Sequence, residues 1–484
     1  VEVTEGHKDE NGVNYNTGVY ADSTYNGDLK VNIENKAKHT IGIAVSENST
    51  VNYSGTIKTS KDSIGILAKG NLVTKDSSFN IDGGTGIFVD STADVKIGTE
   101  NTKMHLSNRA TAIYQNGGKL TLGPKLTFDE NSMGTLLISR NAEAISDISY
   151  SVKTDSLGIG LYYTDAKNHN FSSSGKITLC SDNATGIYAQ SIGTGTNTLK
   201  NKGEIITSDG MKSTIGIYSD NVNVESNKIS IGENGVGIYL TKKVDLKNTE
   251  ITLNGEHSVG IYSENISGDS NYSVGKITSE KDNQTGLFIL NDTYEENKNI
   301  TLSNLDIHLA NNSKGVGLQN AHYTINEGSK ISVGDKSTGL AFKNADATVK
   351  ANINVGKKSL ALYAQGEKNV TFEGEINADT DSKLVYAKEK ATITLNKFNN
   401  LTVNCGLGLG ADKATITADK ETTITVNGGT GAYINEGKID KFKIDVQNGL
   451  GLYIQNDYNG TLPTVSLTGN NSKAYVLESL NKEF

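Results

Sequence analysis

Apolar and polar residues alternate with a period of two in short runs along the whole chain. Residues 176–179 (KITL), 330–333 (KISV) and 443–446 (KIDV) place Ile, Leu or Val at every second position and polar residues between them. This period is that of a β-strand with one buried face. We expect the aliphatic side chains to point inward and to stack on the same position one repeat away.

A second pattern is a four-residue phrase that we call the signature: Thr, Ile or Val, then Gly, then Ile or Leu, then Tyr or Phe. The clearest copies are residues 185–188 (TGIY), 215–218 (IGIY), 236–239 (VGIY), 259–262 (VGIY) and 285–288 (TGLF). With relaxed copies there are about twenty, spaced about 20 to 31 residues apart, which is the range of solenoid repeats. The repeat predicts one domain over residues 1–484.

One repeat contains three short strands and no helix. Residues 237–240 (GIYL), 244–246 (VDL) and 249–253 (TEITL) each have strand periodicity and are separated by turns. So few residues leave no room for a crossover helix. The sequence therefore predicts an all-β, three-sided parallel β-helix of about twenty coils. A leucine-rich repeat has a similar period, but no repeat carries its Leu-x-x-Leu-x-Leu spacing.

In the signature, we expect the residues on both sides of the Gly to face the core, and the Gly and the aromatic residue to face outward. Successive coils then align an aromatic row, made of Tyr162, Tyr188, Tyr218, Tyr239, Tyr262 and Phe288. Such a row is typical of structural ring stacking. A sugar- or protein-binding stripe is the functional alternative, and rings that face inward are a third.

Charge and composition argue against several classes of partner. The formal charge is −9 with Lys and Asp/Glu interleaved, so no basic face is expected for nucleic acid or an anionic membrane. Arg109 and Arg140 are the only arginines. No apolar run approaches the roughly 20 residues of a membrane-spanning helix. Cys180 and Cys405 lie about nine repeats apart, too far for a disulfide.

The sequence contains no pattern that predicts catalysis, a metal or a cofactor. Polysaccharide-cleaving enzymes need clustered carboxylates, whereas Asp and Glu are scattered here through turns. The seven histidines occur singly and no pair has metal-ligand spacing. We therefore expect a protein that is not an enzyme, with no catalytic residues, no metal and no cofactor.

Two coils depart from the regular length. Those that open at Gly186 and Gly286 run to about 30 residues, and their extra residues, 191–197 and 291–297, are expected to form surface loops. Harmless insertions are the alternative. The candidate binding residues are those of the two loops and of the aromatic row: Thr194, Thr196, Asn197, Tyr294, Glu295, Glu296, Tyr188, Tyr218, Tyr239 and Tyr262.

The signature and the Gly-x-Ile-x-[Ile/Val] strands stand in a Lys-, Asn- and Ser-rich, Arg-poor background. In this the chain resembles the passenger regions of the large fusobacterial type V autotransporter adhesins, the RadD-like outer-membrane group. The resemblance covers essentially the whole chain. It implies a right-handed β-helix on the bacterial surface, exported through a C-terminal β-barrel that anchors the parent chain in the outer membrane.

The resemblance also implies adhesion to a receptor or glycan of host cells, or to the surface of other bacteria. Both chain ends, Val1 and Phe484, fall inside the repeat array, so we expect a segment of a longer passenger. The sequence leaves three hypotheses open. The segment binds a receptor itself, it is a passive stalk for a binding tip elsewhere in the parent, or it acts on polysaccharide as an enzyme.

Overall fold

The fold is a parallel β-solenoid of about 19 turns, as the repeat predicted. The computed structural model describes residues 1–478 except 4–6, 10–11, 15, 23–24, 36–37, 142–149, 297, 457 and 459–460. The described residues form strands and turns and no helix. Consequently none of them forms a helix able to cross a membrane. Two compact units divide the chain, unit 1 (residues 1–239) and unit 2 (residues 240–484).

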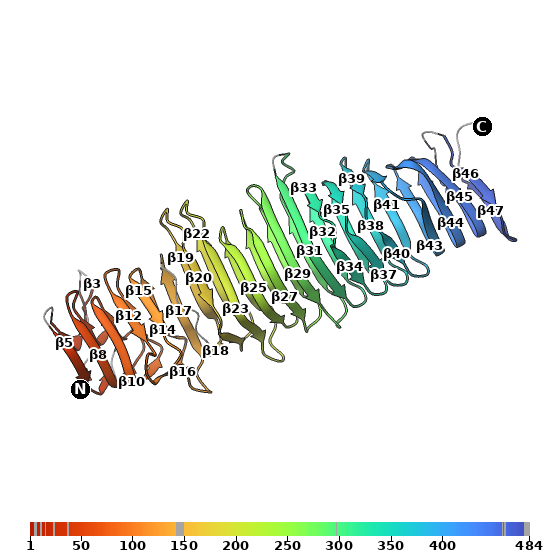
Figure 1. Ribbon diagram of the computed structural model, residues 1–484. Helices are drawn as coiled ribbons and strands as arrows, with labels where there is room; N and C mark the ends of the chain where they lie inside the picture. The colour runs from red at the N-terminus through yellow and green to blue at the C-terminus, as the bar shows by residue number, and fades with distance from the viewer. Residues whose placement is uncertain are drawn as a thin grey trace. The chain divides into compact units, whose positions relative to one another are not determined.

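In unit 1, ten strands carry the signature copies and pair in parallel from coil to coil (Figure 1). They are β4 (Asn16–Ala21), β7 (Thr40–Val45), β9 (Ile64–Ala68), β11 (Thr85–Val89), β14 (Ala110–Asn116), β17 (Gly134–Arg140), β19 (Leu157–Tyr163), β22 (Thr185–Ser191), β24 (Ile215–Asp220) and β26 (Val236–Thr241).

The other strands of unit 1 form the remaining sides of the coils, apart from the antiparallel pair β2 (His7–Asp9) and β3 (Gly12–Asn14). They are β1 (Glu2–Val3), β5 (Asn26–Lys30), β6 (Ile33–Asn35), β8 (Thr50–Thr59), β10 (Asn71–Asp82), β12 (Asp94–Ile97), β13 (Thr102–Ser107), β15 (Lys119–Leu122), β16 (Leu126–Phe128), β18 (Ser151–Thr154), β20 (Asn170–Ser173), β21 (Lys176–Leu179), β23 (Thr198–Thr207) and β25 (Asn223–Ile231).

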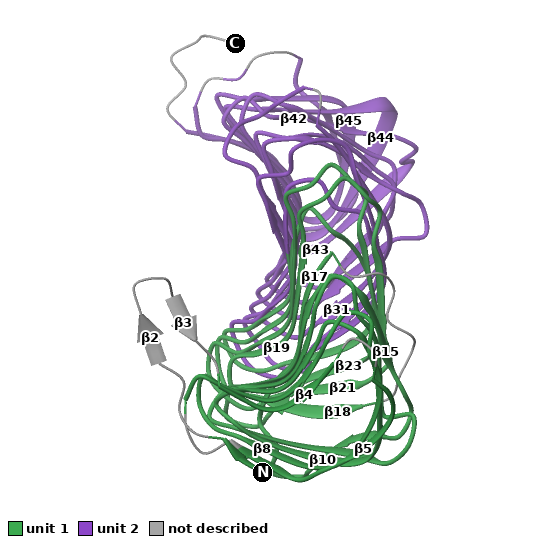
Figure 2. Ribbon diagram, turned by 90° about the vertical axis from the view of Figure 1, so that its left-hand side faces the viewer, with its two compact units in different colours: residues 1–239 green, residues 240–484 purple. Residues whose placement is uncertain are grey.

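Unit 2 repeats this arrangement, and Figure 2 shows the coils of each unit stacked on one another. Its signature strands are β28 (Val259–Glu264), β30 (Thr285–Leu290), β32 (Lys314–Gln319), β35 (Thr338–Lys343), β38 (Leu360–Gln365), β41 (Lys383–Lys388) and β47 (Ser472–Leu477). Near the C-terminal end, single long strands contain both a signature copy and a preceding side of the coil: β43 (Asn400–Asp412), β44 (Thr415–Asn435) and β45 (Lys438–Ile454).

The remaining strands of unit 2 form the other sides of its coils. They are β27 (Leu246–Leu253), β29 (Ser270–Thr278), β31 (Asn299–Leu309), β33 (His322–Ile325), β34 (Lys330–Val333), β36 (Asp346–Val349), β37 (Asn352–Val355), β39 (Asn369–Phe372), β40 (Ile376–Ala378), β42 (Thr392–Leu395) and β46 (Thr464–Leu467).

The core consists of aliphatic ladders, as the alternation predicted. Ile187 pairs in register with Ile217, and both side chains are fully buried. In unit 2, Ile261 and Leu287 form the same pair. Each methylene removed from water in such a ladder contributes about 0.8 kcal/mol. Every coil therefore gains stability from its neighbours.

The prediction for the glycine of the signature is wrong. Thr185, expected in the core, is half-exposed, and Gly186, expected outside, is buried. A Cβ atom on Gly186 would lie 2.6 Å from the carbonyl oxygen of Gly216 and 2.8 Å from Cγ2 of Ile205. Since Ile187 is buried as well, two successive residues face inward, which a strict period of two does not allow. The glycine is needed because the next coil comes so close.

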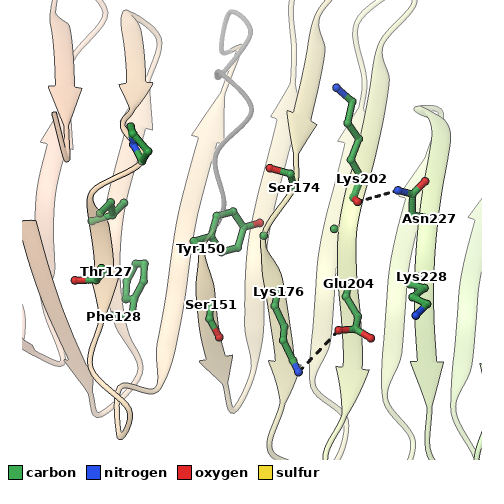
Figure 3. Close-up of a pocket in the computed structure, with 14 residues that line it drawn as sticks. Thr127, Phe128, Tyr150, Ser151, Ser174, Lys176, Lys202, Glu204, Asn227 and Lys228 are labelled. Atoms are coloured by element: carbon green, nitrogen blue, oxygen red, sulfur yellow. Dashed lines mark hydrogen bonds and ion pairs between the residues drawn. The ribbon is translucent and has the colours of Figure 1, made fainter.

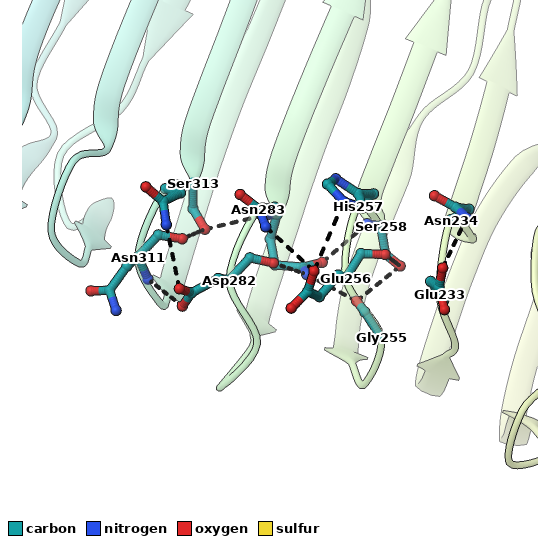
Figure 4. Close-up of polar contacts among 12 residues, drawn as sticks. Glu233, Asn234, Gly255, Glu256, His257, Ser258, Asp282, Asn283, Asn311 and Ser313 are labelled. Carbon is teal, nitrogen blue, oxygen red and sulfur yellow. Dashed lines mark hydrogen bonds and ion pairs between the residues drawn. The ribbon is translucent and has the colours of Figure 1, made fainter.

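Buried serine side chains fix the turns before the signature strands β32 and β35 of unit 2. The N–H of Ser313 donates to the Ser337 hydroxyl at 2.9 Å, and the N–H of Ser337 donates to the Ser359 hydroxyl at 3.0 Å. Outside this ladder, Figure 4 shows the Asp282 carboxylate accepting the N–H of Asn311 at 3.1 Å. These contacts satisfy backbone donors that a turn leaves unpaired, and so hold the coils in register.

Candidate functional site

The aromatic row predicted in unit 1 is present over three residues. Tyr188 stacks on Tyr218 with ring centroids 4.9 Å apart, and Tyr218 stacks on Tyr239 at 5.1 Å. All three rings are half-exposed, so they neither enter the core nor stand free in solvent. Stacked pairs of this kind contribute about 0.5–1.5 kcal/mol beyond the area they bury. The row thus stabilises the coils and also presents ring edges on the surface.

Tyr162 joins this row from a different position. It is in register with Gln190, whereas Gly160 occupies the position that pairs with Tyr188. The Tyr162 ring leans over Gly160, so that a Cβ atom there would lie 3.2 Å from Cε2 of the ring. Its centroid reaches 5.6 Å from that of Tyr188, at a tilt of 38°. The prediction that Tyr162 belongs to the row was right about the residue type. Its position is wrong, because Tyr162 lies two residues beyond Gly160, the register partner of Tyr188.

Unit 2 carries its own aromatic pairs at the same position of the signature. Tyr262 stacks on Phe288 at 6.0 Å, and Tyr363 stacks on Tyr386 at 6.3 Å. Burial and the neighbouring Glu264 raise the pKa of Tyr262, whose hydroxyl donates to that carboxylate at 3.2 Å. Between Phe288 and Tyr363 the row is interrupted, because the corresponding residues are Gly317 and Ala341. In the sequence this gap is visible as the absence of an aromatic residue at Gly317 and Ala341, a signal that the predicted row did not include.

The loop of residues 191–197 exposes two of its three candidate residues. Thr194 and Thr196 are exposed, whereas only 1% of Asn197 is accessible. The Asn197 side chain donates to the Ser191 hydroxyl at 2.8 Å and accepts the N–H of His169 at 2.9 Å. Asn197 therefore closes the loop and does not lie on its surface.

The loop that begins at Asn291 is fastened to later coils of unit 2. The Tyr294 hydroxyl donates to the Asp346 carboxylate, and the ammonium group of Lys368 lies 3.3 Å from the centroid of the Tyr294 ring. Lys368 also pairs with Asp346 at 3.6 Å. Glu295 and Glu296 are exposed, and Asn297 lies outside the described residues. Of the three candidates in this loop, only Tyr294 is engaged within the protein by a contact to another coil.

These contacts shift the titration of two groups. Burial and the adjacent Asp346 raise the pKa of the Tyr294 hydroxyl to about 12. Burial also acts to raise the pKa of Asp346, but the hydrogen bonds from Tyr294 and from the Asn369 N–H, together with the charge of Lys368, outweigh it. The pKa of Asp346 therefore lies below its usual value, and the carboxylate stays charged at neutral pH.

Unit 1 also contains an open groove of about 650 Å³ (Figure 3). Among the described residues, Lys176, Lys202 and Lys228 line it together with one carboxylate, Glu204, which lies 3.9 Å from the Lys176 ammonium group. Glycoside hydrolysis in most families needs two carboxylates across the bond that breaks. The part of the lining that the structure describes has one carboxylate. Elsewhere in the described part of the chain, no three His, Cys, Asp or Glu residues converge as metal ligands.

Comparisons with known proteins add no relative. The chain matches no protein-family model, no curated protein sequence and no solved structure at a significant level.

Proposed function

We propose that this chain is a non-enzymatic adhesin segment that binds a receptor or glycan on host cells or on other bacteria. The observation that carries the proposal is the contrast between a regular, paired scaffold and a few exposed irregularities. Thr194, Thr196, Glu295 and Glu296 stand in loops on coils whose other strands are fully paired. Recognition commonly uses loops that a rigid scaffold holds in place.

The proposal extends to location. The repeat resembles the passengers of fusobacterial type V autotransporters of the RadD-like group, which implies display at the outer surface of the bacterial outer membrane. The low arginine content and the interleaved charges are consistent with a protein or glycan partner and offer no basic face to nucleic acid.

A passive stalk is the second candidate. The regular strand pairing and the stacked rings Tyr188, Tyr218 and Tyr239 favour it, because both features serve rigidity. A stalk would project a tip elsewhere in the parent chain and would not itself adhere. The two candidate functions therefore differ in whether the isolated chain adheres to cells.

Adhesion of the isolated chain tests the proposal. Beads coated with the chain are incubated with epithelial cells and, separately, with co-cultured bacterial species, and bovine serum albumin beads serve as the control. The proposal expects specific retention that soluble chain abolishes. Retention equal to the control in both cases would favour the stalk. Release of reducing ends from polyuronate or hyaluronan by the chain would instead favour an enzyme.

A further inference from the structure

The interruption of the aromatic row in unit 2 leaves a slot on the outer face of the signature sheet. Strands β30, β32, β35 and β38 follow one another there, and Phe288, Gly317, Ala341 and Tyr363 occupy one register position. At about 4.8 Å per coil, three steps place the backbones of the two aromatic residues about 14 Å apart. The neighbouring filled pair, Tyr262 and Phe288, has centroids 6.0 Å apart.

The slot has an apolar floor and two aromatic ends. The Phe288 ring leans over Gly317, where a Cβ atom would meet its Cδ2 at 2.7 Å. Beyond it Ala341 is half-exposed, and the Tyr363 ring closes the far end. The cavity between them measures about 330 Å³. This volume falls at the lower end of small-molecule sites and suits one or two sugar rings.

Three polar side chains stand at the rim without a partner among the described residues: Lys314, Gln319 and Lys343. Lys314 and Lys343 are exposed at opposite ends of their strands. Farther along the same column the polar groups are already engaged. Gln365 accepts the Tyr363 hydroxyl at 3.0 Å, and Lys388 lies 3.7 Å from the Glu389 carboxylate. Beside the slot, the ammonium groups of Lys314 and Lys343 have no carboxylate partner among the described residues.

We propose that this slot binds a saccharide with a carboxylate-bearing pyranose ring. The C–H face of a pyranose is apolar and matches the negative face of an aromatic ring. Its carboxylate matches the unpaired ammonium group of Lys343, and its hydroxyls match the amide of Gln319, the register partner of Lys343. Lys314 adds positive charge at the other end of the slot. The inference rests on the proposed function, because it names the ligand class that an adhesive surface of unit 2 recognises.

A peptide fits this place less well. Extended peptides gain affinity by adding a strand to a free sheet edge. Each of the strands β30, β32, β35 and β38 is already paired on both sides, so the slot offers ring faces and side chains but no backbone edge.

The test is a binding measurement with defined saccharides. Isothermal titration of the full chain with a hyaluronan tetrasaccharide and with 3′-sialyllactose is compared with chitotetraose and lactose, their neutral counterparts. Ala341→Tyr fills the slot with a ring that the same register position already accepts at Tyr363. We expect binding of at least one acidic saccharide, and a loss of at least about tenfold in Ala341→Tyr, because the added ring occupies the space between Phe288 and Tyr363 that the saccharide would fill.

Matched variants separate charge from fold. Lys343→Gln should lower the affinity for the acidic saccharide about tenfold and make that affinity less dependent on salt concentration. Lys388→Gln, in the same column but beside a filled position, should leave binding unchanged. Equal thermal midpoints of all variants complete the control.

Several outcomes would overturn the inference. They are equal affinity for acidic and neutral saccharides, no saccharide binding at all, undiminished binding by Ala341→Tyr, or displacement by an Asp- and Tyr-containing peptide in place of a saccharide. The proposed function fails separately. It would survive these results if wild-type beads and Ala341→Tyr beads adhered equally to cells, and it would fail if neither adhered.

Discussion

The two long coils carry insertions that begin at the same point of the repeat and are held in different ways. The loop after β22 closes on its own coil and the one before it, through Asn197, Ser191 and His169. The loop after β30 instead extends to Asp346, which is two coils on from the end of the insertion, and to Lys368. The length of a coil thus predicts that an insertion exists. Individual polar side chains determine whether the inserted loop contacts only its own and the preceding coil or also binds to later coils.

The largest expected effect on stability comes from the buried signature glycine that both long coils contain, Gly186 in one and Gly286 in the other. Gly186→Val and Gly286→Val each place a side chain against a backbone oxygen 2.5–2.6 Å from the Cβ position and against a core isoleucine. Both should lower the free energy of unfolding by about 3 kcal/mol or more, because neither neighbour is free to move. Urea unfolding followed by circular dichroism measures the change. Thr185→Val, at the half-exposed neighbour, should change stability by less than about 0.5 kcal/mol.

Asn197 provides the next effect and is specific to the first loop. Asn197→Ala leaves the N–H of His169 without its side-chain acceptor in a buried place, so we expect a loss of about 1–3 kcal/mol. Thr196→Ala, one residue earlier and exposed, is the matched control and should be neutral. Denaturation midpoints decide the matter. Equal stability of the two variants would mean that the loop does not depend on its buried amide.

Tyr294 is the corresponding residue of the second loop. Tyr294→Phe removes the hydrogen bond to Asp346 but keeps the ring beside Lys368, so the expected loss is about 0.5–1.5 kcal/mol. Proteolysis of the loop under native conditions should accelerate as well, since the loop loses its hydrogen bond to Asp346. Glu296→Ala in the same loop should alter neither property. If Tyr294→Phe had the same stability and proteolysis rate as Glu296→Ala, the hydrogen bond to Asp346 would not stabilise the loop.

The smallest effect is a dependence on pH. The folded pKa of Asp346 is lowered, so its contribution to stability is fully present above the unfolded pKa of about 3.9 and is lost as the pH falls through the folded value. Asp346→Asn should therefore flatten the acid limb of the stability curve for unit 2. An unchanged acid limb in that variant, measured by thermal unfolding between about pH 2 and pH 6, would contradict this assignment.

The sequence predicted the fold class and the aliphatic ladders, because periods of two and of one coil are direct consequences of strand geometry. It misplaced Gly186, since the close approach of the next coil, and not the alternation, decides which way that residue faces. Tyr162 was assigned to the row by its type, whereas its register pairs it with Gln190.

The candidate site was predictable only in outline. Thr194, Thr196, Glu295 and Glu296 are exposed as a loop position suggests. The burial of Asn197 and the contact of Tyr294 with Asp346 were not predictable, because Asn197 accepts the backbone N–H of His169, 28 residues away, and Tyr294 contacts a carboxylate 52 residues away. The predicted row included only positions that carry an aromatic side chain. The slot at Gly317 and Ala341 exists because these two positions carry no aromatic side chain.

Adhesion by matched surface variants tests whether the irregular surface features recognise a partner while the regular scaffold only supports them. Beads carry the wild type, a loop variant with Ala at Thr194, Thr196, Glu295 and Glu296, or the loop variant combined with Ala341→Tyr. Retention on host cells or partner bacteria is counted under flow. We expect strong retention for the wild type, less retention for the loop variant and background retention for the combined variant. Equal retention by all three folded proteins would contradict it.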